Sequence, residues 1–137
     1  MKKLLFIINK NGDLLNNIQC LIKASHIMIN NNEYTKGLEY LKCIYNRASH
    51  KLKPMECKNI FLDIGILILY LYDTNKLNEY LNTQDFFMLT KEYNLLYQLI
   101  ITINQHELIK YENIINDYNS ILLPWKIKLL TIMKDRI

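Results

Sequence analysis

The chain has 137 residues and a formal net charge of +4; half of its residues are hydrophobic and 22% are charged. This length and composition predict a folded chain of one domain, spanning residues 1–137, and exclude a disordered one. The 3 Gly and 2 Pro are too few for the tight turns of a strand-rich fold, and the scattered Lys residues argue against nucleic-acid binding, which favours a basic stripe.

The first two predicted helices form an antiparallel hairpin. Asp13 is a candidate N-cap, and an apolar stripe with helical spacing follows it at Leu14, Leu15, Ile18, Leu21 and Ile22. The Asn run at 30–32 interrupts the chain. One face of the second helix then carries Tyr34, Leu38, Leu41 and Tyr45. Gly37 lies inside this helix, where a glycine often lets a neighbouring helix come close.

The third predicted helix begins near Pro54, a residue that suits the first turn of a helix. From Ile60 to Tyr72 the helix is apolar on nearly every face, so it must be covered on both sides. Four of its side chains are expected to be deeply buried: Ile64, Leu67, Ile68 and Leu71. Because the segment contains Asp63 and ends at Asp73, it is a buried helix and not an uncharged membrane span of about 20 residues.

Four further helices are predicted towards the C-terminus. Thr74 is a candidate cap for the fourth, which carries Leu77, Tyr80 and Leu81. The fifth has the stripe Leu89, Tyr93, Leu96, Ile100 and Ile103, and the sixth has Leu108, Tyr111, Ile115 and Tyr118. The seventh begins near Pro124 and carries Trp125, Leu129, Ile132 and Met133. The recurring hairpins predict an all-α fold, a right-handed α-solenoid or compact stack of tetratricopeptide-like antiparallel helix pairs with about seven helices.

The inventory of reactive side chains points away from an enzyme. The sequence has no paired carboxylates, nucleophile–base set or Gly-rich phosphate loop. Its Cys residues, at 20, 43 and 57, form no CxxC pair, and its His residues, at 26, 50 and 106, lack metal-ligand spacing. We therefore expect buried thiols in a reducing cytosol, and no metal, nucleotide or other cofactor.

The segment NDYNSILLPWKIKLLTIMKD (116–135) resembles the closing segment of the soluble N-ethylmaleimide-sensitive factor attachment proteins (SNAPs). There an acidic-Tyr-Asp-Ser-Ile run precedes a Trp-led helix, and the matching positions are Asp117, Tyr118, Ser120, Ile121, Trp125, Leu129, Leu130 and Lys134. The segment 20–46 is similar to two earlier family helices through Cys20, Leu21, Lys23, Tyr34 and Ile44. KEYNLLYQLI (91–100) is similar to the family's R-E-x-x-L-L-x-x-L. The resemblance is nearer to the α/β type of SNAP than to the γ type.

The resemblance implies a non-enzymatic adaptor of vesicle trafficking. Members of the family bind the four-helix SNARE complex, which contains syntaxin-like proteins, and recruit the N-ethylmaleimide-sensitive factor, an ATPase that pulls the complex apart. A cytoplasmic location with peripheral membrane contact, and no nucleic acid, is implied as well. The alternative is a generic tetratricopeptide-like scaffold with an unrelated peptide ligand.

Some features depart from the family. The chain resembles the C-terminal half of a SNAP, and the family's acidic tail does not follow KDRI (134–137). The acidic residues that face the ATPase in the family correspond here to Ile101, Asn104 and Gln105. We therefore expect a fragment, a truncated copy or a short paralogue, attenuated in that its contact with the ATPase is weakened.

Two sets of site residues follow from the resemblance and the charges. A basic surface for the acidic SNARE complex is expected from Lys23, Lys126, Lys128, Lys134 and Arg136. The alternative for those in the last helix is that they complement its dipole. A structural cap is expected from Tyr118, Ser120, Trp125 and Leu129, with Trp125 as a core anchor and the first two shaping the turn.

Overall fold

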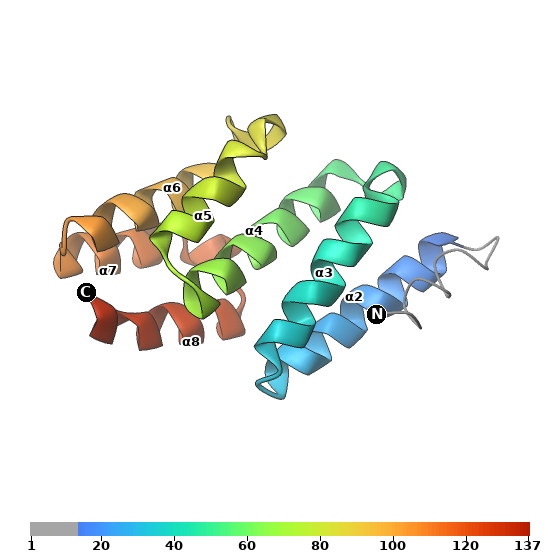
Figure 1. The fold of residues 1–137 in the computed structure, drawn as a ribbon, viewed down its shortest axis with the longest axis horizontal. Helices are drawn as coiled ribbons and strands as arrows, with labels where there is room; N and C mark the ends of the chain where they lie inside the picture. Colours follow the sequence, from blue (N-terminus) through green and yellow to red (C-terminus); the bar gives the residue numbers. More distant parts are fainter. Residues whose placement is uncertain (1–13) are drawn as a thin grey trace. The chain divides into compact units, whose positions relative to one another are not determined.

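The structure is a computed structural model that describes residues 14–137, with side chains from residue 17 onward. This part of the chain is helical and contains no strand. Its seven α-helices are Leu14–Asn30 (α2), Tyr34–Ala48 (α3), Pro54–Leu71 (α4), Thr74–Asn82 (α5), Lys91–Asn104 (α6), Leu108–Asp117 (α7) and Pro124–Ile132 (α8) (Figure 1). The predicted all-α fold of about seven helices is confirmed. The candidate cap Asp13 and the side chains of Leu14 and Leu15 lie outside the described residues.

The chain divides into two compact units, Met1–Ile60 and Phe61–Ile137, and the boundary between them falls inside α4. The first unit contains α2, α3 and the first turns of α4. The second contains the rest of α4 together with α5 to α8. That the whole chain acts as a single domain stays a prediction.

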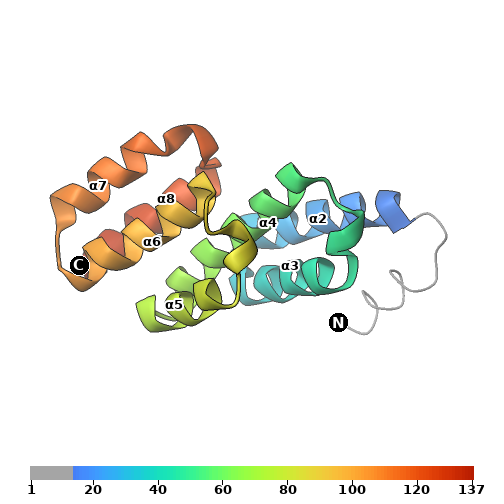
Figure 2. The ribbon, with the colours of Figure 1, turned by 90° about the horizontal axis from the view of Figure 1, so that it is seen from above.

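The first unit is built on the hairpin of α2 and α3, which lie side by side in both ribbon views (Figures 1 and 2). Its core consists of side chains from the predicted stripes and their neighbours: Ile18, Leu21, Ile29, Leu38, Leu41 and Ile44. A Cβ atom at Gly37 would lie 2.7 Å from Cγ1 of Ile29. The prediction that Gly37 allows a close approach of the neighbouring helix is therefore confirmed.

The start of α4 is fixed by a carboxylate. Pro54 is the first helical residue, as predicted. The backbone N–H of Lys53 donates to Oε1 of Glu56 at 3.1 Å, and the side-chain amide of Gln19, on α2, donates to the other oxygen of Glu56. These hydrogen bonds, the backbone one first, hold the pKa of Glu56 below its usual range.

The second unit is built around α4, whose side chains are all buried from Phe61 to Leu69. The ring of Phe61 stacks on Phe87, 4.4 Å away between centroids, and on Tyr80 and Tyr93 at 5.6 and 6.2 Å. Gly65 allows α6 to pack close to α4, because a Cβ atom there would lie 2.4 Å from Cδ1 of Leu96.

The predicted burial of α4 is confirmed for three of four positions. Ile64, Leu67 and Ile68 expose 5% or less of their surface. Leu71 is only half-buried, so its prediction is wrong. It is the last residue of α4, and the chain turns away to start α5 three residues later.

Two predicted helix starts need correction. Asp73, not Thr74, caps α5, since its carboxylate accepts from the backbone N–H of Lys76 at 2.8 Å. Leu89 is 98% exposed and is not part of the fifth stripe. It precedes α6, which begins at Lys91 under the cap of Thr90. The outer stripe members Leu108 and Ile132 are also exposed, each at 42%.

Substituting Ile64 by Asp is expected to abolish cooperative thermal unfolding. An unpaired charge in this buried position costs several kcal/mol, a large part of a typical folding free energy. Circular dichroism melting curves measure the effect, and Leu89→Asp is the matched control because that side chain faces water. A cooperative transition in Ile64→Asp, or its loss in the control, would contradict the described core.

Candidate partner-binding surface

The closing segment runs from α7 through a single 3-10 turn, Asn119–Ile121, into α8 and a final turn at Met133–Arg136. The turn is closed by backbone hydrogen bonds from Ile121 to Tyr118 and from Leu122 to Asn119, at 3.1 and 3.2 Å. The Tyr118 hydroxyl accepts from the side-chain amide of Asn94, on α6. Tyr118 thus shapes the turn through its backbone and ties it to α6 through its side chain, whereas Ser120 is exposed.

A buried tyrosine joins α7 to α8. Tyr111 is fully buried, and its hydroxyl donates to the backbone oxygen of Leu130 at 2.6 Å. Burial raises the pKa of Tyr111 well above its ordinary value, because the phenolate would lose its hydration. Leu129 and Leu130 are also fully buried. The expected cap residue Leu129 therefore lies in the core of this unit.

Lys126, predicted as a partner-binding residue, lies in the interior. It exposes 3% of its surface, and its ammonium forms an ion pair with the carboxylate of Asp63, which is 2% exposed on α4. The ammonium also lies 5.5 Å from the ring centroid of Trp125. Trp125 itself is half-buried and is not the expected core anchor of α8. Leu129 and Leu130, which are fully buried, anchor the helix instead. Lys126 is therefore not part of an exposed basic surface.

The last two predicted basic residues also make contacts within the second unit. Lys134 lies 3.8 Å from a carboxylate oxygen of Glu112, on α7. Arg136 donates from Nη1 to the backbone oxygen of Tyr70 at 2.8 Å, and its guanidinium lies 5.0 Å from the centroid of the Tyr70 ring. Both side chains fasten the end of the chain onto earlier helices.

Lys23 and Lys128 are the exposed members of the predicted set that lie within helices. Lys23 is on α2, in the first unit, and Lys128 is on α8, in the second. Within the described residues, Lys23, Lys128 and Arg136 are the members of the predicted set that are classed as exposed. Their role in binding a partner stays a prediction.

The positions that the resemblance matches to acidic family residues lie at the end of α6. Asn104 accepts a hydrogen bond from the Thr74 hydroxyl at 2.7 Å, Gln105 is the exposed residue that ends the helix, and Ile101 is half-buried. Ile101 lines a groove of about 310 Å³ whose other lining residues come from α6 and α7: Gln98, Thr102, Lys110, Asn113 and Ile114. This surface is mostly apolar.

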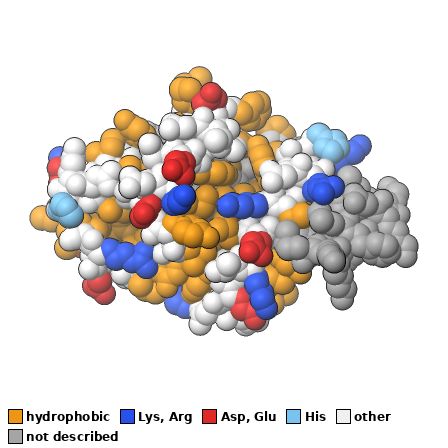
Figure 3. All heavy atoms as spheres, in the orientation of Figure 1, with side chains coloured by type: hydrophobic (Ala, Val, Ile, Leu, Met, Phe, Trp, Pro, Cys, Tyr) orange, Lys and Arg blue, Asp and Glu red, His pale blue; other side chains and the backbone are white. Residues whose placement is uncertain are grey.

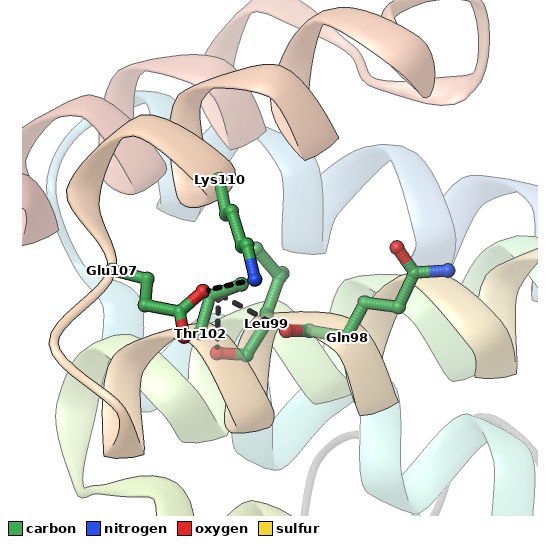
Figure 4. A network of polar contacts seen from close by, with 5 residues as sticks. All are labelled: Gln98, Leu99, Thr102, Glu107 and Lys110. Carbon is green, nitrogen blue, oxygen red and sulfur yellow. Dashed lines mark hydrogen bonds and ion pairs between the residues drawn. The ribbon is translucent and has the colours of Figure 1, made fainter.

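One wall of this groove is held by a polar network (Figure 4). The hydroxyl of Thr102 donates to the backbone oxygens of Gln98 and Leu99 at 3.0 and 3.1 Å. At the start of α7, Lys110 forms an ion pair with Glu107 at 2.8 Å. The positive charge beside the groove is thus balanced by a neighbouring carboxylate.

The cysteines differ from the expected buried thiols in one case. Cys43 is buried and Cys57 is half-buried, and burial raises the pKa of both thiols. Cys20 is exposed on α2, so the expectation of a buried thiol is wrong there. Across residues 14–137, no three His, Cys, Asp or Glu side chains are grouped closely enough to hold a metal ion.

The residue that sequence reasoning missed is Asp63. It appeared only as evidence against a membrane span, although a lone carboxylate in an apolar helix requires a buried partner. The need of Asp63 for a buried partner was the one sign in the sequence that a lysine faces inward. Which lysine would meet it could not be read from the sequence, because helical spacing in α8 gives no clear apolar face.

In the part of the chain that the structure covers, no helix combines the length and hydropathy of a bilayer span.

The Asp63–Lys126 pair can be tested by a double-mutant cycle. Asp63→Leu or Lys126→Met alone is expected to lower the free energy of unfolding by about 3–5 kcal/mol, because each leaves the other charge buried and unpaired. Combining Asp63→Leu with Lys126→Met should restore most of that loss, since both charges are removed. Urea denaturation gives the values. Additive losses in the double variant would contradict the pairing.

Tyr111→Phe is expected to cost about 1 kcal/mol of stability at neutral pH through loss of the hydrogen bond to Leu130. Because the folded-state pKa of Tyr111 is raised, its contribution to stability is complete below the unfolded pKa of about 10 and is lost as the pH rises above it. The variant should therefore lose less stability than the parent between about pH 9 and about pH 11. Equal losses in that range would contradict a buried phenol.

The family model of the soluble NSF attachment proteins, SNAP, matches residues 10–137. Searches of curated proteins and of solved structures give no significant match. The SNAP family is a family of helical, tetratricopeptide-like solenoids with a non-enzymatic adaptor role, in agreement with the helical hairpins described above. The match covers nearly all of the chain, and the protein therefore belongs to the soluble NSF attachment protein family.

Proposed function

We propose that the protein is a non-enzymatic adaptor of vesicle trafficking that binds SNARE complexes with syntaxin-like members and contacts the N-ethylmaleimide-sensitive factor. The observation that carries this proposal is the family match over residues 10–137. A cytoplasmic location and peripheral membrane contact belong to the same proposal. The chain would act by holding partners together through its surface.

The structure supports a smaller basic surface for the SNARE complex than the sequence predicts. Lys126 is buried against Asp63, and Lys134 and Arg136 make contacts with Glu112 and Tyr70. The exposed Lys23 and Lys128 are the residues we propose for electrostatic contact. Contacts between exposed charges chiefly raise the association rate and are screened by salt, so the binding should be weak and salt-dependent.

Contact with the ATPase is proposed to be attenuated. The residues at the end of α6 that correspond to acidic family positions, Ile101, Asn104 and Gln105, carry no charge. The nearby groove is mostly apolar, and Lys110 beside it is neutralised by Glu107. A basic surface on the ATPase would therefore find no carboxylate at these positions, and an unpaired interfacial charge costs affinity.

A SNARE disassembly assay tests both parts. The protein alone is expected to support little disassembly by the ATPase, and in excess over a full-length SNAP it should inhibit, because it occupies the SNARE complex while its contact with the ATPase is too weak to stimulate disassembly. Efficient disassembly by the protein alone would contradict the attenuation.

The basic contact has its own matched test. Lys23→Glu with Lys128→Glu should weaken SNARE binding, and Lys42→Glu with Lys91→Glu is the control because it changes the net charge equally at other exposed positions. Equal effects of the two pairs would show attraction by net charge alone and overturn the assignment.

Binding of cytosolic proteins other than SNAREs, with no SNARE captured, would favour the generic scaffold.

A further inference from the structure

The segment between α5 and α6 exposes three large apolar side chains on one short turn. In this apolar loop, residues 85–90, the exposed fractions are 86% for Phe86, 54% for Met88 and 98% for Leu89. Figure 1 places the loop at the end of α5, and Figure 3, in the same orientation, shows hydrophobic side chains gathered at that edge. Exposed apolar groups that cluster in this way mark interaction sites more often than isolated ones do.

The apolar loop is rigidly attached to the second unit. Phe87 points inward, is 1% exposed and stacks on Phe61 at 4.4 Å. Phe86 contacts the Phe87 ring edge-on at 5.3 Å. The outward side chains are therefore presented by a fixed scaffold, which reduces the entropy lost when they bind.

Several backbone donors of the loop are already satisfied within it. The N–H groups of Phe87, Met88 and Thr90 donate to the oxygens of Gln84, Asp85 and Phe87 at 2.9–3.1 Å. The Thr90 hydroxyl donates to the same Phe87 oxygen at 2.7 Å. Internal satisfaction of polar backbone groups is what an apolar medium demands, because that medium offers no hydrogen-bond partners.

The residues that flank the apolar tip in sequence carry little net charge. Asp85 and Lys91 are exposed at its two ends with opposite charges, and the residues that lead into it, Asn82 and Thr83, are exposed and uncharged. Polar flanks of little net charge beside an apolar tip suit the headgroup region of a bilayer above its acyl chains.

We propose that the apolar loop inserts Phe86, Met88 and Leu89 into the boundary between headgroups and acyl chains of a phospholipid bilayer. Three side chains of this size offer at most about 600 Å², less than the roughly 800 Å² that each partner buries in a stable protein interface. A bilayer needs no complementary shape, so a small protruding tip suffices. The proposal depends on the proposed function in one respect, since it supplies a site for the peripheral membrane contact proposed there. It does not require the SNARE complex.

Sedimentation of the full-length protein with zwitterionic phosphatidylcholine vesicles tests the proposal. These vesicles are chosen because the net charge of +4 would add a separate attraction to anionic lipid. The parent should bind weakly and reversibly, in the range of a single acyl anchor, with half of it bound at about 0.1 mM accessible lipid. The triple variant Phe86→Ser, Met88→Ser, Leu89→Ser should bind at least about tenfold less.

The matched control is Leu108→Ser, Ile109→Ser, Leu123→Ser, which removes three exposed apolar side chains elsewhere in the second unit. It should bind vesicles as the parent does, and circular dichroism melting should show both variants folded. If the loop variant unfolds, Phe86→Ser and Leu89→Ser are measured singly, each with a reduced partition expected.

Three outcomes would overturn the proposal: no vesicle binding by the parent, equal binding by the loop variant, or an equal loss in the control variant. Self-association of the parent that the loop variant abolishes, without vesicle binding, would assign the loop to a second copy of the chain. SNARE binding is measured separately in vesicle-free solution. There the loop variant should match the parent, so failure of the proposed function and failure of the loop proposal give different results.

Discussion

The burial of α4 from Phe61 to Leu69 is the constraint on which the second unit depends. A helix without a polar face has to be covered all round, and the stacked rings of Tyr80, Phe87 and Tyr93 meet it at Phe61 while Leu96 fits over Gly65. Asp63 lies within this buried stretch, where an isolated carboxylate would be too costly. The ion pair with Lys126 meets that cost, and it fixes which side of α8 faces inward.

This pairing redistributes the charges of the closing segment. A run of basic residues near a C-terminus invites the interpretation of a binding surface, yet Lys126, Lys134 and Arg136 all contact other helices of the same unit. These three basic residues thus join α8 and the end of the chain to α4 and α7 of the same unit. For a family of adaptors this matters, because an exposed charge and an inward one respond differently to salt and to substitution.

The sequence predicted the helices well because their apolar periodicity and their prolines are local signals. Pro54 and Pro124 begin α4 and α8 as expected, and Gly37 does allow a close helix approach. Predictions for single residues failed at helix ends, and in one case because of a contact distant in the sequence. Asp73 replaced Thr74 as a cap through a local choice between two suitable residues, whereas Lys126 turned inward because of a carboxylate more than sixty positions away. Leu89 looked like a core residue, but the helix start at Lys91 left it in water.

The most direct test of this account is lysine footprinting of the native protein with a small amine-reactive reagent, quantified by mass spectrometry of peptides. Lys126 should be protected by its burial and its ion pair, while Lys128, two positions along the same helix, and Lys23 should react readily. Protection of Lys126 should be lost in denaturant. Equal reactivity of Lys126 and Lys128 in the native protein would contradict the buried ion pair and return Lys126 to the exposed basic surface.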